Sequence, residues 1–161
     1  MLSIHMVDDM PKHIESGLKY LAAVKLKEQG ESQQKIAEEL DIDRSTVSHY
    51  LNGRNLSWNS IGVAKTITEL YPLDFLTMVQ VIIQDPVKIR KIVSICKKYE
   101  YDGIVNESCI GCGLCVDLCF MKAISLVSLK AQINSIHCCG CKTCENRCPT
   151  NSIKILEIED D

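Results

Sequence analysis

Eight cysteines in two evenly spaced groups are the residues most able to do chemistry in this 161-residue chain. The spacing C-x2-C-x2-C-x3-C occurs twice, 29 residues apart, at Cys109, Cys112, Cys115 and Cys119 and again at Cys138, Cys141, Cys144 and Cys148. Three thiolates at such steps reach three irons of one [4Fe–4S] cube, and the fourth ligand comes from the other copy. The pattern therefore predicts two clusters with crossed ligands.

The crossing assigns four cysteines to each cluster. The first set is Cys109, Cys112, Cys115 and Cys148, and the second is Cys138, Cys141, Cys144 and Cys119. Zinc is the alternative metal, but tetrahedral zinc sites normally use two separated cysteine pairs. Gly111 and Gly140 occupy the same place in each copy and are expected to adopt positive φ. Pro149 is expected to end a short helix, whereas the first copy has Phe120 there, which is expected to loosen the turn.

The duplicated motif resembles the bacterial-type two-[4Fe–4S] ferredoxin domain, over roughly the last third of the chain. The resemblance implies a small (βαβ)2 domain, which we place at residues 104–161. Its strands are expected at 104–105, 124–126, 131–134 and 153–157. Cys139 adjoins a ligand and is interpreted as a spacer lining the cluster, with substitute ligation as the alternative. Cys96 lies far from the motif and is expected to be a core thiol.

The distribution of cysteine and charge limits the class of protein. Nine of the ten cysteines follow residue 108, which divides the chain into a cysteine-poor and a cysteine-dense part. The first residues lack the basic and apolar pattern of a secretion signal, and no segment has the apolar length of a membrane span. We therefore expect a cytoplasmic protein with reduced thiols and no membrane partner.

The first part of the chain has helical periodicity. Leu18, Leu21, Ala22 and Leu26 share one face of a helix at 14–29 that ends at Gly30. A second helix at 33–40, capped by Ser32, leads into the turn 41–43. Asp43 is expected to cap a third helix, whose inward face is Val47, Tyr50 and Leu51. Residues 1–12 are expected to form a loose arm.

The segment 32–54 resembles the helix-turn-helix of lambda-repressor-like regulators, with Asp41 where these motifs usually carry glycine. The resemblance implies that the third helix enters the major groove of double-stranded operator DNA. The expected DNA contacts are Ser32, Gln33, Arg44, Ser45, Ser48, His49, Asn52 and Arg54. Although the net charge is −3, residues 44–68 contain no Asp or Glu, which favours phosphate contact. The alternatives are a packing-only helical hairpin and solvated surface residues.

Three more helices are expected at 57–70, 72–84 and 86–99. The helix at 72–84 is apolar on nearly every side, so we expect the Pro72–Tyr99 helices to form a homodimer interface. Residues 100–103 are expected to be a short link, which gives a helical domain at 1–103 and an overall α+β fold class.

Two functions are consistent with this pairing of modules. The favoured prediction is a transcription regulator whose clusters sense redox state, oxygen or iron–sulfur supply. The alternative is a ferredoxin-type electron carrier, with a redox partner protein and a helical docking module. An enzyme is not expected, because the sequence shows no nucleophile–base pair or phosphate loop, and cysteine fills every ligand position of both clusters.

Overall fold

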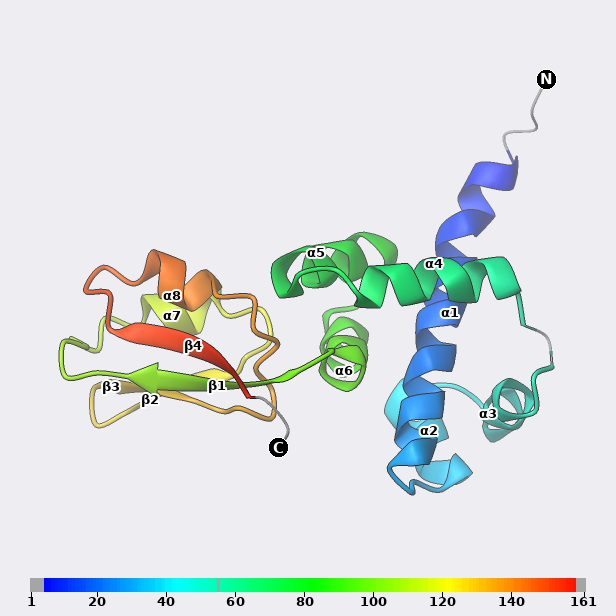
Figure 1. The fold of residues 1–161 in the computed structure, drawn as a ribbon, viewed down its shortest axis with the longest axis horizontal. Coiled ribbons are helices and arrows are strands. Elements are labelled where there is room, and N and C mark those ends of the chain that lie inside the picture. Colours follow the sequence, from blue (N-terminus) through cyan, green and yellow to red (C-terminus); the bar gives the residue numbers. More distant parts are fainter. Residues whose placement is uncertain (1–4, 55, 159–161) are drawn as a thin grey trace. The chain divides into compact units, whose positions relative to one another are not determined.

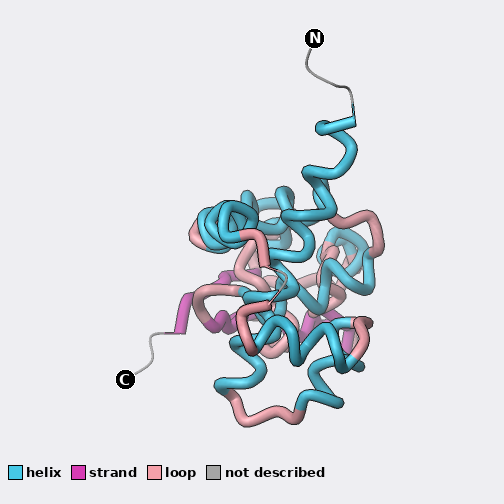
Figure 2. Tube along the Cα trace, turned by 90° about the vertical axis from the view of Figure 1, so that its right-hand side faces the viewer, coloured by secondary structure: helices cyan, strands magenta, loops and turns pink. Residues whose placement is uncertain are grey.

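The computed structural model describes residues 5–54 and 56–158 and has an α+β fold. The chain divides into two compact units, one of Met1–Leu70 with Thr77–Cys96 and one of Tyr71–Leu76 with Lys97–Asp161. In the described residues, all strands belong to the second unit (Figures 1 and 2). Within these residues no helix has the length and apolarity needed to span a membrane.

The helices of the chain follow the expected order. They are α1 (His5–Glu28), α2 (Gln33–Leu40), α3 (Arg44–Leu51), α4 (Trp58–Thr68), α5 (Pro72–Ile82) and α6 (Pro86–Cys96). Helix α1 packs against α2, α3, α4 and α6 (Figure 1). The buried core of the helical unit includes Leu18, Ala22, Ile36, Val47, Ala64, Ile92 and Val93. Burial of these apolar side chains is the main stabilising force of the unit.

Helix α1 is longer than the sequence predicts. It begins at His5, so the expected loose arm is wrong for residues 5–12, while residues 1–4 lie outside the described part. The close crossing of α1 and α4 depends on Gly17, because a Cβ there would lie 2.6 Å from the carbonyl oxygen of Ser60. A glycine at this position lets the two backbones approach each other.

The turn between α2 and α3 is built by its local sequence. The Ser32 hydroxyl caps α2 by accepting a hydrogen bond from the Lys35 amide at 3.2 Å. Asp41 ends α2 with φ 53°, which confirms that aspartate replaces glycine in the left-handed conformation here. Asp43 occupies the N-cap position of α3, as expected, but the expected capping hydrogen bond to its side chain is absent.

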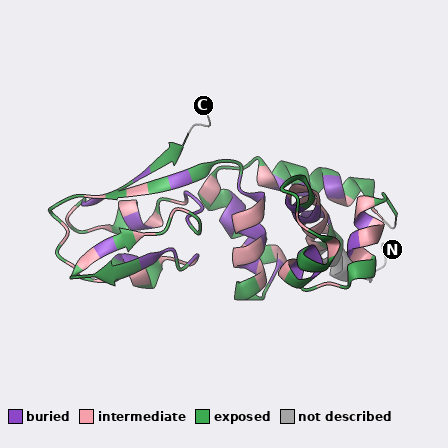
Figure 3. Cartoon of the chain, turned by 90° about the horizontal axis from the view of Figure 1, so that it is seen from below, coloured by how far each residue is buried: buried purple, intermediate pink, exposed green. Residues whose placement is uncertain are grey.

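Helices α5 and α6 differ in how completely they are covered. Asp85 caps α6 through its carboxylate, which accepts from the amides of Val87 and Lys88 at 2.8 and 3.1 Å. Helix α6 ends at Cys96, three residues before the expected end at Tyr99. Helix α5 buries Val79 but leaves Val81 71% exposed, so one side of this apolar helix is open to solvent. Figure 3 shows the buried, intermediate and exposed residues along the described chain.

The second unit repeats a strand–helix–strand element. The first copy contains β1 (Glu100–Val105), α7 (Leu114–Leu118) and β2 (Ile124–Val127). The second copy contains β3 (Lys130–Ile133), α8 (Thr143–Arg147) and β4 (Ile153–Ile158). Strand β1 pairs antiparallel with β4, and β2 pairs antiparallel with β3. The expected link at 100–103 is wrong, because these residues pair with Ile155–Ile158 in the β1–β4 ladder.

Candidate iron–sulfur centres and candidate DNA interface

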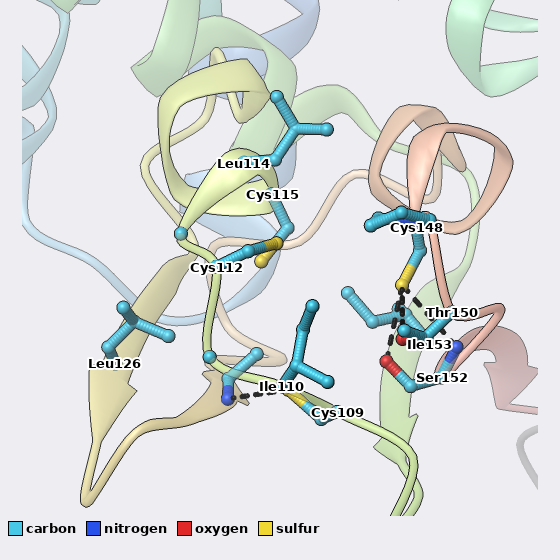
Figure 4. Close-up of a pocket in the computed structure, with 14 residues that line it drawn as sticks. Cys109, Ile110, Cys112, Leu114, Cys115, Leu126, Cys148, Thr150, Ser152 and Ile153 are labelled. Atoms are coloured by element: carbon cyan, nitrogen blue, oxygen red, sulfur yellow. Dashed lines mark hydrogen bonds between the residues drawn. The ribbon is translucent and has the colours of Figure 1, made fainter.

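The first expected ligand set surrounds one cavity in the second unit. Residues of both copies line it, and they leave about 300 Å³ free of protein atoms. Its cysteines are Cys109, Cys112, Cys115 and Cys148, with Ile110, Leu114 and Leu126 among the apolar lining (Figure 4). Cys112 is exposed to solvent, whereas Cys115 is buried. The fold therefore brings the fourth cysteine across from the second copy, as the crossed pattern requires.

The second expected ligand set lines a separate cavity. It leaves about 350 Å³ free of protein atoms and contains Cys119, Cys138, Cys141 and Cys144. Cys138 and Cys144 are buried here and Cys119 and Cys141 are half-buried, so none of the four cysteines is fully exposed as Cys112 is. Cys139 also lines it and is buried, which agrees with a spacer position beside the ligands.

The two copies position their cysteines by the same local geometry. In each, the amide four residues after the last cysteine donates to that sulfur: Ala123 to Cys119 at 3.3 Å and Ser152 to Cys148 at 3.4 Å. The intervening Lys122 and Asn151 both adopt positive φ. Helix α7 ends at the same repeat position as α8, so Phe120 neither extends the helix nor loosens the turn. Helix α8 ends just before Pro149, as expected.

Side-chain hydroxyls distinguish the two cavities. The Cys148 sulfur lies 3.2 Å from the Ser152 hydroxyl and 3.6 Å from that of Thr150 (Figure 4). Ala123 and Met121 stand at the equivalent positions of the first copy and offer no such donors. In the second cavity the Thr143 hydroxyl lies 3.5 Å from the Cys141 sulfur. The sequence prediction did not include these hydroxyls. The signal for them is present in the sequence, because aligning the two copies shows that they replace apolar residues.

These contacts favour thiolates at two of the expected ligands. Burial opposes ionisation of Cys148, but hydrogen bonds from Ser152 and Thr150 outweigh it and lower its pKa to about 6. A hydrogen bond from the Cys139 thiol, aided by Thr143, lowers the pKa of Cys141 to about 5. The same hydrogen bond, together with burial, raises the pKa of Cys139, which therefore remains a neutral donor. Thiolate is the form that binds iron.

Glycine is required in the loops that hold the cysteines. Gly111 and Gly140 have φ of 68° and 76°, which confirms the expected positive φ. A Cβ on Gly111 would collide with the backbone of Leu129, and one on Gly140 would collide with the ring of Tyr101. Each loop thus packs against its own unit without space for a side chain.

The donor set fits iron–sulfur clusters. Across the described ranges, no three His, Cys, Asp or Glu side chains converge on the position of a single metal ion. The cysteine sulfurs instead surround two cavities, with amide and hydroxyl donors directed at several of them. Hydrogen bonds to sulfur and exposure to solvent are known determinants of cluster reduction potential.

Cys96 is a core residue of the helical unit, as expected. Its sulfur lies 3.9 Å from the Leu18 carbonyl oxygen, and burial raises its pKa to about 12. A protonated thiol at this position contributes packing and is not available as a metal ligand.

The second and third helices present the expected DNA-binding residues unequally. Arg44, Ser45, Asn52 and Arg54 are exposed, while Ser48 and His49 are half-buried. Ser32 is exposed and Gln33 half-buried at the start of α2. The Asn52 amide donates to the Ser48 carbonyl and hydroxyl oxygens at 2.8 and 3.3 Å, so these two side chains are engaged with each other. Arg44 and Ser45 are exposed in the first turn of α3, which makes them candidates for reading bases.

The orientation of α3 is fixed from its inner face. Val47 and Tyr50 are buried, and the Tyr50 ring meets Tyr20 of α1 edge to face with 6.1 Å between centroids. Gly53, with φ 68°, ends the helix, and the Arg54 amide then donates to the His49 carbonyl at 2.8 Å. These contacts direct the Arg44 side of the helix outward.

Two family models match this chain. A model described as helix-turn-helix matches residues 24–72, and a model described as a 4Fe-4S dicluster domain matches residues 108–152. These matches confirm both resemblances and establish two [4Fe–4S] clusters as the cofactors. Among solved structures, none matches this chain significantly.

Two curated proteins of Methanocaldococcus jannaschii are similar to the chain. The ferredoxin-type protein FwdE is 34% identical over 154 residues, covering 93% of this chain and 100% of that protein. An uncharacterized ferredoxin is 40% identical over 60 residues, covering 34% of this chain and 75% of its own length. The likeness to the first protein includes both units. The chain therefore belongs to the family of the ferredoxin-type protein FwdE, and in this chain a helix-turn-helix domain is fused to a 4Fe-4S dicluster domain.

Proposed function

We propose that this protein is a cytoplasmic, non-enzymatic transcription regulator whose affinity for operator DNA depends on the state of its two [4Fe–4S] clusters. The observation that carries the proposal is the accessible first turn of α3, with Arg44 and Ser45 exposed, in a chain that also assembles two four-cysteine cavities. Electron transfer between proteins does not require an outward-facing recognition helix.

Helix α6 is the element that connects the two functions along the chain. Lys88 of α6 pairs with Asp41 in the helix-turn-helix turn at 3.0 Å, and Lys91 pairs with Glu39 at 3.6 Å. Only residues 97–99 separate the end of α6 from strand β1. A displacement at the start of the ferredoxin domain therefore acts directly on a helix that supports the DNA-binding turn.

The bound clusters supply one-electron oxidation–reduction and are lost under oxidative damage. The chain holds them with eight cysteine thiolates, here assigned as the crossed sets around the two cavities. Because a domain of this size has a small apolar core, cluster loss is expected to disorder the loops 109–119 and 138–148.

A homodimer formed through α5 and α6 would place two α3 helices on one operator. Met78 and Val81 of α5 and Val87 of α6 are exposed apolar side chains in the helical unit. Covering them in a partner would remove an unfavourable contact with water. Paired recognition helices contact half-sites about 34 Å apart, which increases both affinity and specificity.

The dimer can be tested with Val81→Glu. A charge at this exposed position is expected to shift the protein toward monomer and weaken operator binding, without disturbing the buried core. Sedimentation equilibrium under anaerobic conditions gives the dimer dissociation constant. Lys154→Glu, a change on the exposed side of β4, is the control and should leave association unchanged. Parent protein that is monomeric at all concentrations would contradict the proposed interface.

DNA binding in three cluster states tests the proposed function. Oxidised, dithionite-reduced and cluster-depleted protein would be titrated anaerobically against DNA upstream of its own gene. We expect affinity to differ at least tenfold between two of the states, about 1.4 kcal/mol of coupling. Equal and tight affinity for DNA in all three states would show that the clusters have a structural role and do not control DNA binding. Absence of specific binding in every state would favour the electron carrier.

The electron-carrier function remains the second candidate because of the surroundings of Cys112. This exposed cysteine belongs to the first cavity, whose lining includes the exposed apolar residues Ile110, Leu114 and Leu126. An accessible cluster edge with an apolar rim suits brief docking of a redox partner protein. The same surface would serve a regulator as its point of electron entry.

A further inference from the structure

Lys97 is the one buried charged side chain among residues for which the structure describes burial. Its side chain is 4% exposed, and it immediately follows α6. An isolated buried ammonium group is strongly disfavoured, so its position requires compensating partners. The sequence does not predict this burial, because a lysine near the end of an expected helix is ordinarily exposed.

The partners of Lys97 are the backbone carbonyls that precede and include Cys138. Its Nζ donates to the carbonyl oxygens of Ser135, Ile136 and Cys138 at 3.5, 3.3 and 3.2 Å. These residues form the loop that leads into the first cysteine of the second motif, and Cys138 lines the second cavity. The ammonium group is thus held beside the second candidate cluster site.

Glu100, a carboxylate paired with Lys97, is much more exposed to solvent than Lys97. Glu100 Oε2 lies 2.6 Å from Nζ, but the Glu100 side chain is 54% exposed. Water and salt screen a charge at the surface more than a charge in the interior. The buried positive charge therefore acts more strongly on the second cavity than the exposed negative charge does.

We propose that Lys97 is a positioning residue that stabilises the reduced state of the second cluster and holds the loop before Cys138 in place. Reduction adds one electron to the cluster, from dithionite in vitro or from a redox protein, and neither breaks nor forms a bond. A buried cation stabilises the added negative charge and raises the reduction potential. The proposed role in the potential is independent of DNA binding.

The first copy provides a matched lysine at the equivalent loop. Lys130 Nζ donates to the Glu107 carbonyl at 2.8 Å, and Glu107 corresponds to Ile136 under the 29-residue shift. However, the Lys130 side chain is 44% exposed. A lysine with the same kind of partner but in contact with water should have little effect on a cluster, so it serves as the control.

The test is an anaerobic redox titration of the holoprotein, followed by electron paramagnetic resonance. In Lys97→Gln, the oxidised-to-reduced ratio at a fixed potential should rise about tenfold for one of the two reduction steps, equal to about 59 mV. Lys97→Arg, which keeps the charge, should restore the parent value. Glu100→Gln should move the same step in the opposite direction, and Lys130→Gln should move neither.

Three results would overturn the proposal. The first is that Lys97→Gln keeps its full iron content and both reduction potentials stay at the parent values. The second is that Lys97→Arg shifts a potential as much as Lys97→Gln does. The third is that Lys130→Gln shifts a potential by a comparable amount. If Lys97→Gln loses iron, the other two variants decide the question. A shifted reduction potential in Glu100→Gln, together with a parent-like potential in Lys97→Arg, supports the charge effect. An unchanged potential in Glu100→Gln contradicts it. Unregulated DNA binding by the parent protein would contradict the proposed function but not this role of Lys97.

Discussion

Cys138→Ala is expected to halve the iron and acid-labile sulfide of the protein and to destabilise the ferredoxin domain. Cys138 is buried in the second cavity, and its removal leaves one iron without a thiolate. Because cluster binding free energy contributes to folding, the variant should also unfold at a lower temperature. Iron analysis and anaerobic calorimetry measure the two effects.

The neighbouring Cys139 provides the matched control. It lines the same cavity and is buried, but it remains a neutral thiol that donates to Cys141. Cys139→Ala should therefore retain both clusters, with a lower potential for the second because a hydrogen bond to sulfur is lost. If Cys139→Ala loses iron and Cys138→Ala does not, the cluster ligand is Cys139 and not Cys138.

Arg44→Ala is expected to weaken specific DNA binding by roughly 5- to 150-fold. Arg44 is exposed in the first turn of α3, and one arginine contact to a base is worth about 1–3 kcal/mol. Fluorescence anisotropy with operator and unrelated DNA separates loss of specificity from loss of charge. If Arg44 contacts only phosphate, both DNAs should lose affinity to the same extent.

An arginine in the other unit controls for net charge. Arg147 is exposed at the end of α8, so Arg147→Ala removes the same charge from the ferredoxin domain. We expect its operator affinity to stay within about twofold of the parent, since screening limits long-range effects. Equal weakening by the two substitutions would argue against α3 as the recognition helix.

The sequence predicts most closely what local residues determine. Ser32 caps α2, Asp41 adopts the left-handed conformation, and Gly30 follows the end of α1, because each depends on neighbours within a few residues. The grouping of the eight cysteines follows from a duplicated spacing. These features need no knowledge of distant contacts.

The errors arise where distant contacts decide. Residues 100–103 contain Gly103 and two acidic residues, which suggest a link, yet pairing with β4 makes them a strand. Asp43 has a capping side chain, but it does not make the hydrogen bond in α3. The burial of Lys97 depends on carbonyl groups 38 to 41 residues later, and no short sequence window contains them.

The pairing of β1 with β4 has a consequence for synthesis of the protein on the ribosome. The helical unit is complete at Cys96, so it can fold while the rest of the chain is still being made. The ferredoxin domain cannot, because its first strand pairs with its last and the first cavity needs Cys148. Iron loading of the first cavity is therefore expected only after Cys148 has been synthesised.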